Sequence, residues 1–168
     1  MSGTYADFDE VDSFTVGALG QPGQRVFLMQ CTAEGEHLTV KCEKQQAEAI
    51  ATYLRRILDD VAEPAQPLAG VDTLTAPFEP EFVLGQIGLG YLADERRILV
   101  QLEEAGEVDE DGDPIENPSL GRIRLHLTLE QAYAFCERTD EALSGGRPLC
   151  RWCQFPIDPE GHACPRMN

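Results

Sequence analysis

The residues with the clearest chemistry lie near the C-terminal end of the chain, where three cysteines and one histidine follow the spacing C-x2-C-x8-H-x-C. They are Cys150, Cys153, His162 and Cys164. A zinc ion binds four thiolate or imidazole donors in a tetrahedral shell, and four protein donors leave no position open for a substrate. The spacing therefore predicts a structural zinc ion rather than a catalytic one.

A redox dithiol is the alternative interpretation of Cys150 and Cys153. It leaves His162 and Cys164 without a role, and no thioredoxin-like βαβ pattern precedes the pair. Residues 144–168 contain few apolar side chains, so zinc binding would supply most of their folding free energy, on the order of 10–16 kcal/mol. We therefore expect these residues to form a small tail of the zinc-ribbon or knuckle kind.

Cationic and aromatic side chains surround the predicted zinc ligands. They are Arg147, Arg151, Trp152 and Arg166. Such a set could bind nucleic acid. Alternatively, the tryptophan covers the metal and the arginines are solvated or pair with the acidic body. The chain has 13 basic and 30 acidic residues, a net charge of −17, and nucleic-acid affinity depends on neutralising phosphates. The composition therefore favours a protein partner over nucleic acid.

A glycine-rich segment runs from Gly17 to Arg25. Its backbone N–H groups could cradle a small anion, with Arg25 as the counter-charge. No helix follows to add its dipole, so a turn between two strands is the favoured interpretation. If a small anionic ligand binds this protein, we expect it here.

Residues 103–116 contain eight acidic side chains and no basic one. This composition predicts a long, mobile hairpin loop. The opening from Asp109 to Asp113 resembles a calcium-binding loop only weakly, because Gly112 stands at the fourth position and Pro114 at the sixth, where that motif has glycine. Loose attraction of cations is the favoured interpretation.

The first part of the chain alternates apolar and polar residues as strands do. Strands are expected over 11–16, 25–31 and 37–42, followed by a helix over 44–60, where the apolar period becomes that of a helix.

The hairpin between the second and third strands should place Cys31 opposite Leu38 and Cys42 opposite Phe27. The two cysteines would then be roughly 13 Å apart at about 3.3 Å per residue. That separation is too large for a disulfide, so we expect these cysteines, with Cys136, to act as small core residues.

The second part of the chain repeats this order, with strands expected over 82–92, 97–103 and 122–127 and a helix that begins near Thr128. The segment Leu38–Ala47 aligns without a gap on Ile123–Ala132. We therefore predict two β-β-β-α units in one pseudo-symmetric α+β domain with an antiparallel sheet. Its parts are unit one at about 8–61, a proline-rich connector at 62–80, and unit two at about 81–143, within a domain of residues 1–143.

The composition, with 42% hydrophobic and 26% charged residues, is that of a globular protein. No apolar run is long enough to span a membrane, and residues 1–10 lack the features of a secretory signal. We therefore expect a cytoplasmic protein. Outside the tail the histidines are His37 and His126, and neither can be combined with confidence into a nucleophilic set, which favours a non-catalytic role.

Several of these motifs together resemble a known family. They are Phe14-Thr-Val-Gly17, Gly20-Gln-Pro-Gly23-Gln-Arg25-Val-Phe27, and Cys150-x-x-Cys153 followed by Asp158-Pro-Glu-Gly-His162-Ala-Cys164-Pro-Arg166. The family is an uncharacterised actinobacterial domain of unknown function, also described as a "repeat protein". The resemblance implies a cytoplasmic protein with a duplicated domain. It also implies genes beside histidine-phosphatase-like and phosphoinositide-kinase-like proteins, which suits an accessory role in phosphoryl chemistry.

The leading hypothesis is a non-catalytic, zinc-stabilised binding or adaptor protein with a protein partner. The second is an enzyme or binder of a small anion that uses Arg25 in a cleft between the units. The third is a nucleic-acid-associated factor that acts through the tail. A concave pocket between the two units with polar groups around it would favour the second hypothesis.

Overall fold

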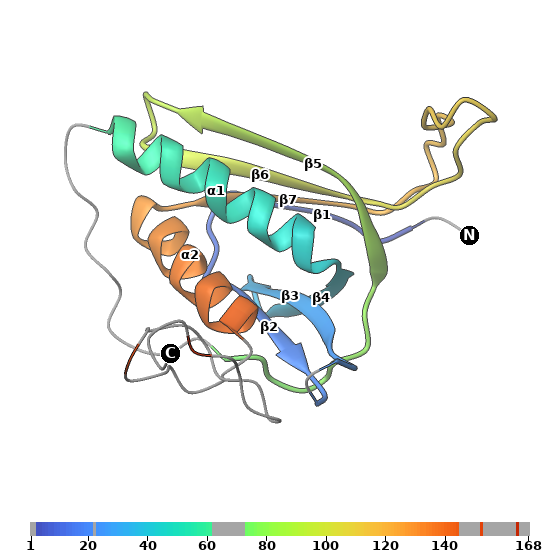
Figure 1. Ribbon diagram of the computed structural model, residues 1–168. Helices are drawn as coiled ribbons and strands as arrows, with labels where there is room; N and C mark the ends of the chain where they lie inside the picture. Colours follow the sequence, from blue (N-terminus) through green and yellow to red (C-terminus); the bar gives the residue numbers. More distant parts are fainter. Residues whose placement is uncertain (1–2, 22, 62–72, 145–151, 153–163, 165–168) are drawn as a thin grey trace.

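The computed structural model describes residues 3–21, 23–61, 73–144, 152 and 164. Its described part contains a seven-stranded sheet and two helices (Figure 1). In chain order the elements are β1 (Tyr5–Phe8), β2 (Ser13–Leu19), β3 (Val26–Ala33), β4 (Glu36–Cys42), α1 (Lys44–Asp60), β5 (Phe82–Leu92), β6 (Arg97–Glu104), β7 (Arg122–Leu127) and α2 (Leu129–Ser144). The predicted α+β class is confirmed.

The strand order is β1-β7-β6-β5-β4-β3-β2. β1 pairs with β7 and β4 pairs with β5 in parallel, whereas the other pairs are antiparallel. The predicted purely antiparallel sheet is therefore wrong. Two parallel strands need a long crossover between them, and α1 with the segment after it provides one between β4 and β5. β1 was not predicted, because a strand of four residues gives little periodic signal.

The two helices lie side by side on one face of the sheet (Figure 1). After β1, the three strands β2–β4 lead into α1 and the three strands β5–β7 lead into α2. Each helix also contacts the other group of strands. α2 packs on β2 and α1 contacts β5. The largest side chains with under 2% exposure fill the space between helices and sheet: Phe14, Phe135, Met29, Ile50, Leu54, Ile98, Leu102, Ile123, Leu125, Leu127, Val40 and Val100.

The third residue of each helix is a glutamine whose side chain accepts the N–H of the capping residue. Gln46 Oε1 accepts the N–H of Glu43 at 2.8 Å, and Gln131 Oε1 accepts the N–H of Thr128 at 2.9 Å. Thr128 Oγ1 in turn accepts the N–H of Gln131 at 3.0 Å, which completes a capping box. The gapless alignment of the two segments pairs Gln46 with Gln131. The repeat in the sequence therefore corresponds to a repeated helix cap.

The same glutamines tie each helix to the other group of strands. The amide of Gln46 donates to the carbonyl oxygens of Leu84 and Gly85, both at 3.1 Å. The amide of Gln131 donates to the carbonyl oxygen of Val11. Each cap therefore also sets where its helix lies on the sheet.

The predicted β3–β4 hairpin is confirmed in register, with Cys31 opposite Leu38 and Phe27 opposite Cys42. Its two-residue loop has left-handed φ angles of 51° at Glu34 and 79° at Gly35, as a type I′ turn requires.

The acidic segment that follows β6 has a defined form. Asp109 Oδ1 accepts the N–H groups of Asp111 and Asp113, both at 2.9 Å, and Val108 forms a bridge to Pro114. The result is a hairpin that projects from one end of the sheet (Figure 1). We call residues 105–118 the acidic arm.

Candidate functional site

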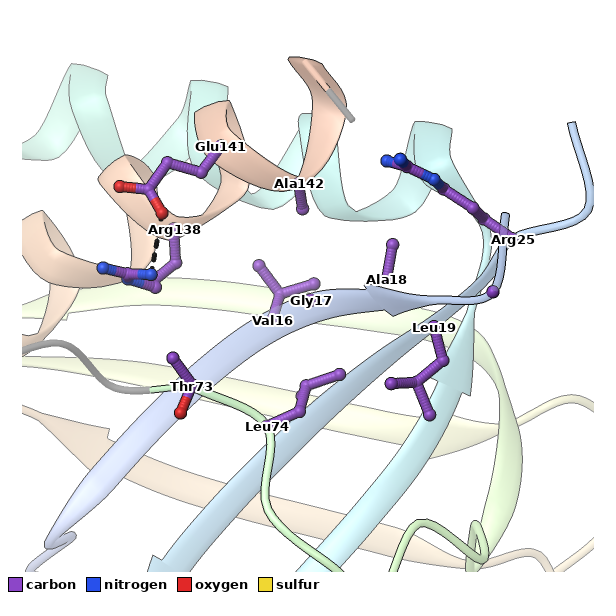
Figure 2. Close-up of a pocket in the computed structure, with 11 residues that line it drawn as sticks. Val16, Gly17, Ala18, Leu19, Arg25, Thr73, Leu74, Arg138, Glu141 and Ala142 are labelled. Carbon is purple, nitrogen blue, oxygen red and sulfur yellow. Dashed lines mark hydrogen bonds and ion pairs between the residues drawn. The ribbon is translucent and has the colours of Figure 1, made fainter. Parts of the chain in front are cut away.

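A cleft with a volume of about 330 Å³ lies between β2, α2 and residues 73–74. Figure 2 shows Val16 and Ala18 on the side of β2 that faces α2, and Ala142 on the helix above them. These small apolar side chains form the middle of the cleft. We call it the β2–α2 cleft.

An aromatic pair joins α2 to β2. On each element it lies a few residues before the residues that line the cleft. The rings of Phe14 and Phe135 stack with centroids 4.5 Å apart and an interplanar angle of 4°. Both side chains are almost fully buried. Because such a pair combines a large buried area with direct ring contact, it fixes the spacing between the two walls of the cleft.

The third wall depends on Gln30, a buried polar residue in the apolar strand β3. Its amide donates to the carbonyl oxygen of Thr75 and accepts the N–H of Thr75, both at 2.8 Å. These bonds hold the neighbouring Leu74 against Gly17, where an added Cβ would lie 2.7 Å from Leu74 Cγ. Sequence reasoning missed Gln30, although a polar residue inside an apolar strand was a usable signal.

Charged groups lie at the two ends of the cleft. Figure 2 shows Arg25 at one end and Arg138 with Glu141 at the other. Arg138 Nη1 is 2.7 Å from Glu141 Oε2, one helical turn away on α2. The charge of Arg138 is therefore largely balanced within the helix. The other arginine of the lining, Arg25, lies at the opposite end of the cleft.

The glycine-rich segment is the strand-connecting turn that its sequence favoured. Gly20 and Gly23 have left-handed φ angles of 102° and 90°, and the N–H of Gln24 donates to the carbonyl oxygen of Gln21 at 2.9 Å. This N–H group is therefore bonded within the turn and does not point to an anion. Both features predicted for an anion reach the cleft, since Gly17, Gly20 and Arg25 line it.

The predicted zinc site lies mostly outside the described residues. Cys150, Cys153 and His162 are not among them, and neither are Arg147, Arg151 and Arg166. Of the predicted residues in the tail, the structure describes Cys164, which is buried with 7% exposure, and Trp152, which is 51% exposed.

The other three cysteines are buried core residues, as predicted. Burial raises the pKa of the Cys31 and Cys42 thiols from 9.0 to about 12. Burial also raises the pKa of Cys136 to about 11, and its thiol donates to the carbonyl oxygen of Ala51 at 3.5 Å. Because the thiolate is the nucleophile, none of the three is suited to catalysis at neutral pH.

His126 lies on the face of β7 opposite Leu125 and Leu127 and is surrounded by carboxylates. Its Nε2 is 3.9 Å from Asp9 and its Nδ1 is 3.8 Å from Glu95. Asp7 joins this group, with ligand atoms of Asp7, Asp9 and His126 within 4.8 Å of one another. No sequence signal pointed to this cluster, because only the pairing of β1 with β7 brings its members together.

A positive charge already lies beside this carboxylate cluster. Arg124 is 3.8 Å from Asp7, so the cluster forms part of a surface ion-pair network. The other described histidine, His37, has its Nδ1 3.3 Å from Thr32 Oγ1. It lines a separate, smaller pocket that shares Thr73 with the β2–α2 cleft.

One protein family matches the chain. The model of the family described as "Protein of unknown function (DUF3090)" covers residues 6–164. No curated protein and no solved structure matches the chain. Among the described residues, no helix is both long and apolar enough to cross a membrane. The family match includes both groups of strands, both helices and all four predicted zinc ligands, so it applies to the whole architecture.

Proposed function

The chain belongs to the DUF3090 family, and we propose that it is a non-catalytic binding protein that holds a small anionic ligand in the β2–α2 cleft. One observation carries the proposal. A concavity lies between a strand of the first group and the helix of the second, and Arg25 lines it. A pocket between the two units is the arrangement that we expect, from the sequence, for an enzyme or a binder of a small anion.

The cleft suits a compact ligand with one anionic end. Its volume of about 330 Å³ is at the lower end of the roughly 300–1,000 Å³ that is typical of ligand sites. Val16, Ala18 and Ala142 offer apolar contact, while the Arg25 guanidinium can bind a carboxylate or phosphate through two N–H groups. A phosphate monoester on a small apolar body fits both features and agrees with an accessory role in phosphoryl chemistry.

The chemistry of the lining supports a binding role over catalysis. None of the described residues that line the cleft is a cysteine or a histidine. The buried thiols elsewhere keep their protons at neutral pH because of their raised pKa values. Histidine is the most common general acid or base, and a cysteine thiolate is a strong nucleophile. The carboxylate among the described lining residues, Glu141, is paired with Arg138.

The tail completes the proposal as a zinc-stabilised element. Three thiols and one imidazole are a donor set that zinc prefers, and the burial of Cys164 suits a ligand shielded from water. We also propose that the two β-β-β-α groups arose by duplication. The matched caps at Gln46 and Gln131, each bonded to the other group, support it.

The cleft is tested with phenyl phosphate as the probe, by isothermal titration of the whole protein. Replacing Arg25 by Gln should weaken binding by about tenfold or more, because a charge-assisted hydrogen-bond pair is lost. The matched control is Arg56→Gln, which removes the same charge from an exposed position on α1 and should leave the affinity nearly unchanged.

Two results would contradict the cleft assignment. An equal loss in both variants would show that only net charge matters. Unchanged binding in Ala142→Phe, which places a large side chain in the cleft, would show that the ligand binds elsewhere.

Zinc is tested by elemental analysis and limited proteolysis. We expect about one zinc ion per chain, and Cys150→Ser should lose it, so that residues 144–168 become sensitive to protease because metal binding supplies their folding free energy. Cys136→Ser, a change to a core thiol, is the control and should retain zinc. A metal-free preparation with a protease-resistant tail would contradict the prediction.

A further inference from the structure

A second cavity lies at the base of the acidic arm. Its volume of about 660 Å³ is twice that of the β2–α2 cleft. Its walls come from Tyr5 of β1, residues 85–86 of β5, the end of β6, both limbs of the arm and the start of β7. We call it the arm cavity.

The walls of the arm cavity are held by short backbone contacts. The pairing of β5 with β6 shifts register between Leu84 and Ile87, and such a bulge bends the strand away from its neighbour. Just beyond it, the N–H of Ala105 donates to Val83 at 2.7 Å. An added Cβ at Gly85 would lie 2.7 Å from Ala105 Cα, so the base of the arm is closely packed.

The two limbs of the arm are also fixed to each other and to β7. The N–H of Ile115 donates to the carbonyl oxygen of Glu107 at 2.9 Å. The N–H of Gly121 donates to Glu104 Oε2 at 2.7 Å, and the N–H of Glu104 donates to the carbonyl oxygen of Gly121 at 2.8 Å. A cavity built this way exists before any ligand arrives, which lowers the entropy cost of binding.

The lining combines exposed apolar groups with carboxylates. Val108 is 60% and Ile115 is 46% exposed. Of the described residues that line the cavity, Arg122 is the one cation, and it pairs with Glu103 at 3.1 Å. Among the described residues, Glu107 and Glu116 have no cation within 4.0 Å.

We infer that the arm cavity is a docking site for a basic segment of a partner protein. An apolar side chain of that segment enters between Val108 and Ile115, and flanking lysines or arginines face Glu107 and Glu116. Complementary charge steers such encounters and suppresses wrong partners. The exposed apolar groups argue for a peptide over a bare cation, because a metal ion gains nothing from contact with them.

The test uses the whole protein and a fluorescently labelled short peptide of alternating lysine and leucine, with binding followed by anisotropy. Comparison probes are a lysine–glycine peptide of the same length and spermine. The lysine–leucine peptide should bind at least about tenfold more tightly than either, since only it supplies both charge and apolar contact. Equal or tighter binding of spermine would replace the peptide by a small polycation and overturn the proposal.

A pair of double variants separates the cavity from general attraction by charge. Glu107→Gln with Glu116→Gln removes two charges from the lining, whereas Glu110→Gln with Asp111→Asn removes two from the arm tip outside it. The first pair should weaken peptide binding by about tenfold and the second by less than about threefold. Similar losses in both would reduce the effect to net charge and overturn the site.

Amide chemical shifts of the unmodified protein give a test that does not depend on a variant folding. Addition of the lysine–leucine peptide should shift signals from residues 85–86 and 104–122. The single variant Ile115→Ser should abolish those shifts while the arm keeps its fold. Shifts centred on the β2–α2 cleft or on α1 would contradict the assignment.

Discussion

The β2–α2 cleft and the arm cavity differ in charge and in how the chain builds them. The cleft has arginine side chains at both ends, and its walls come from β2, α2 and residues 73–74, which are distant in the sequence. The arm cavity carries unpaired carboxylates, and most of its wall comes from residues 103–122. The net charge of −17 therefore does not decide whether each site prefers an anionic or a cationic ligand. The charged side chains that line each site decide it.

The two sites should also differ in what they need from the core. The cleft exists only while α2 stays on β2, so it depends on tertiary packing at Phe14 and Phe135. The arm is held by hydrogen bonds between residues that are near in sequence. A core change should therefore affect the cleft first.

The largest expected effect is that of Phe135→Ala. Loss of a fully buried phenylalanine should lower the free energy of unfolding by about 3–5 kcal/mol, measured by urea denaturation, and should abolish phenyl phosphate binding. Val108→Ala, at an exposed position of the arm, is the comparison and should change stability by less than about 0.5 kcal/mol. If both variants cost the same, the cleft does not depend on the core more than the arm does.

An intermediate effect is expected at two glycines, one at each site. In Gly17→Ala the new methyl group would lie 2.7 Å from Leu74 Cγ, and such overpacking costs about 1–3 kcal/mol and should also weaken ligand binding at the cleft. In Gly112→Ala the space is open but φ is +87°, so the cost should be that of a left-handed alanine, roughly 1 kcal/mol. Thermal unfolding of both variants measures the difference, and loss of cleft binding in Gly112→Ala would contradict it.

The last expected effect develops gradually as the pH becomes alkaline. Burial raises the pKa of Cys31 and Cys42 from 9.0 to about 12. Above pH 9 the unfolded chain releases these protons while the folded chain keeps them, so stability falls as pH rises toward 12. The slope is about 1.4 kcal/mol per pH unit for each thiol.

Urea midpoints between pH 8 and pH 11 measure this slope, and Cys42→Ala should reduce it by the contribution of one thiol. The acidic arm contains no cysteine, so the release of thiol protons should not act on it directly. Peptide binding at the arm cavity should therefore persist up to about pH 9.5, above which the lysines of the peptide begin to lose their charge. A slope that Cys42→Ala leaves unchanged would show that other groups cause it.

Much of the local structure could be predicted from the sequence. Strands β5 and β7 have the predicted bounds, α1 covers the predicted 44–60, and the Cys31–Leu38 register is confirmed. The reason is that hydrophobic period, turn residues and capping glutamines act over a few neighbouring positions. The same local signals placed Arg25 beside a turn and predicted four zinc ligands in the tail, whose role stays a prediction.

Which elements meet was decided by the tertiary structure. The parallel pairing of β1 with β7 and of β4 with β5 turned a predicted antiparallel sheet into a mixed one. Packing of α2 on β2 made the cleft, and the hydrogen bonds of Gln30 brought Leu74 to its wall. Periodicity shows which face of an element is apolar, but many partners could cover that face. Only the joint packing of all the elements selects one of them.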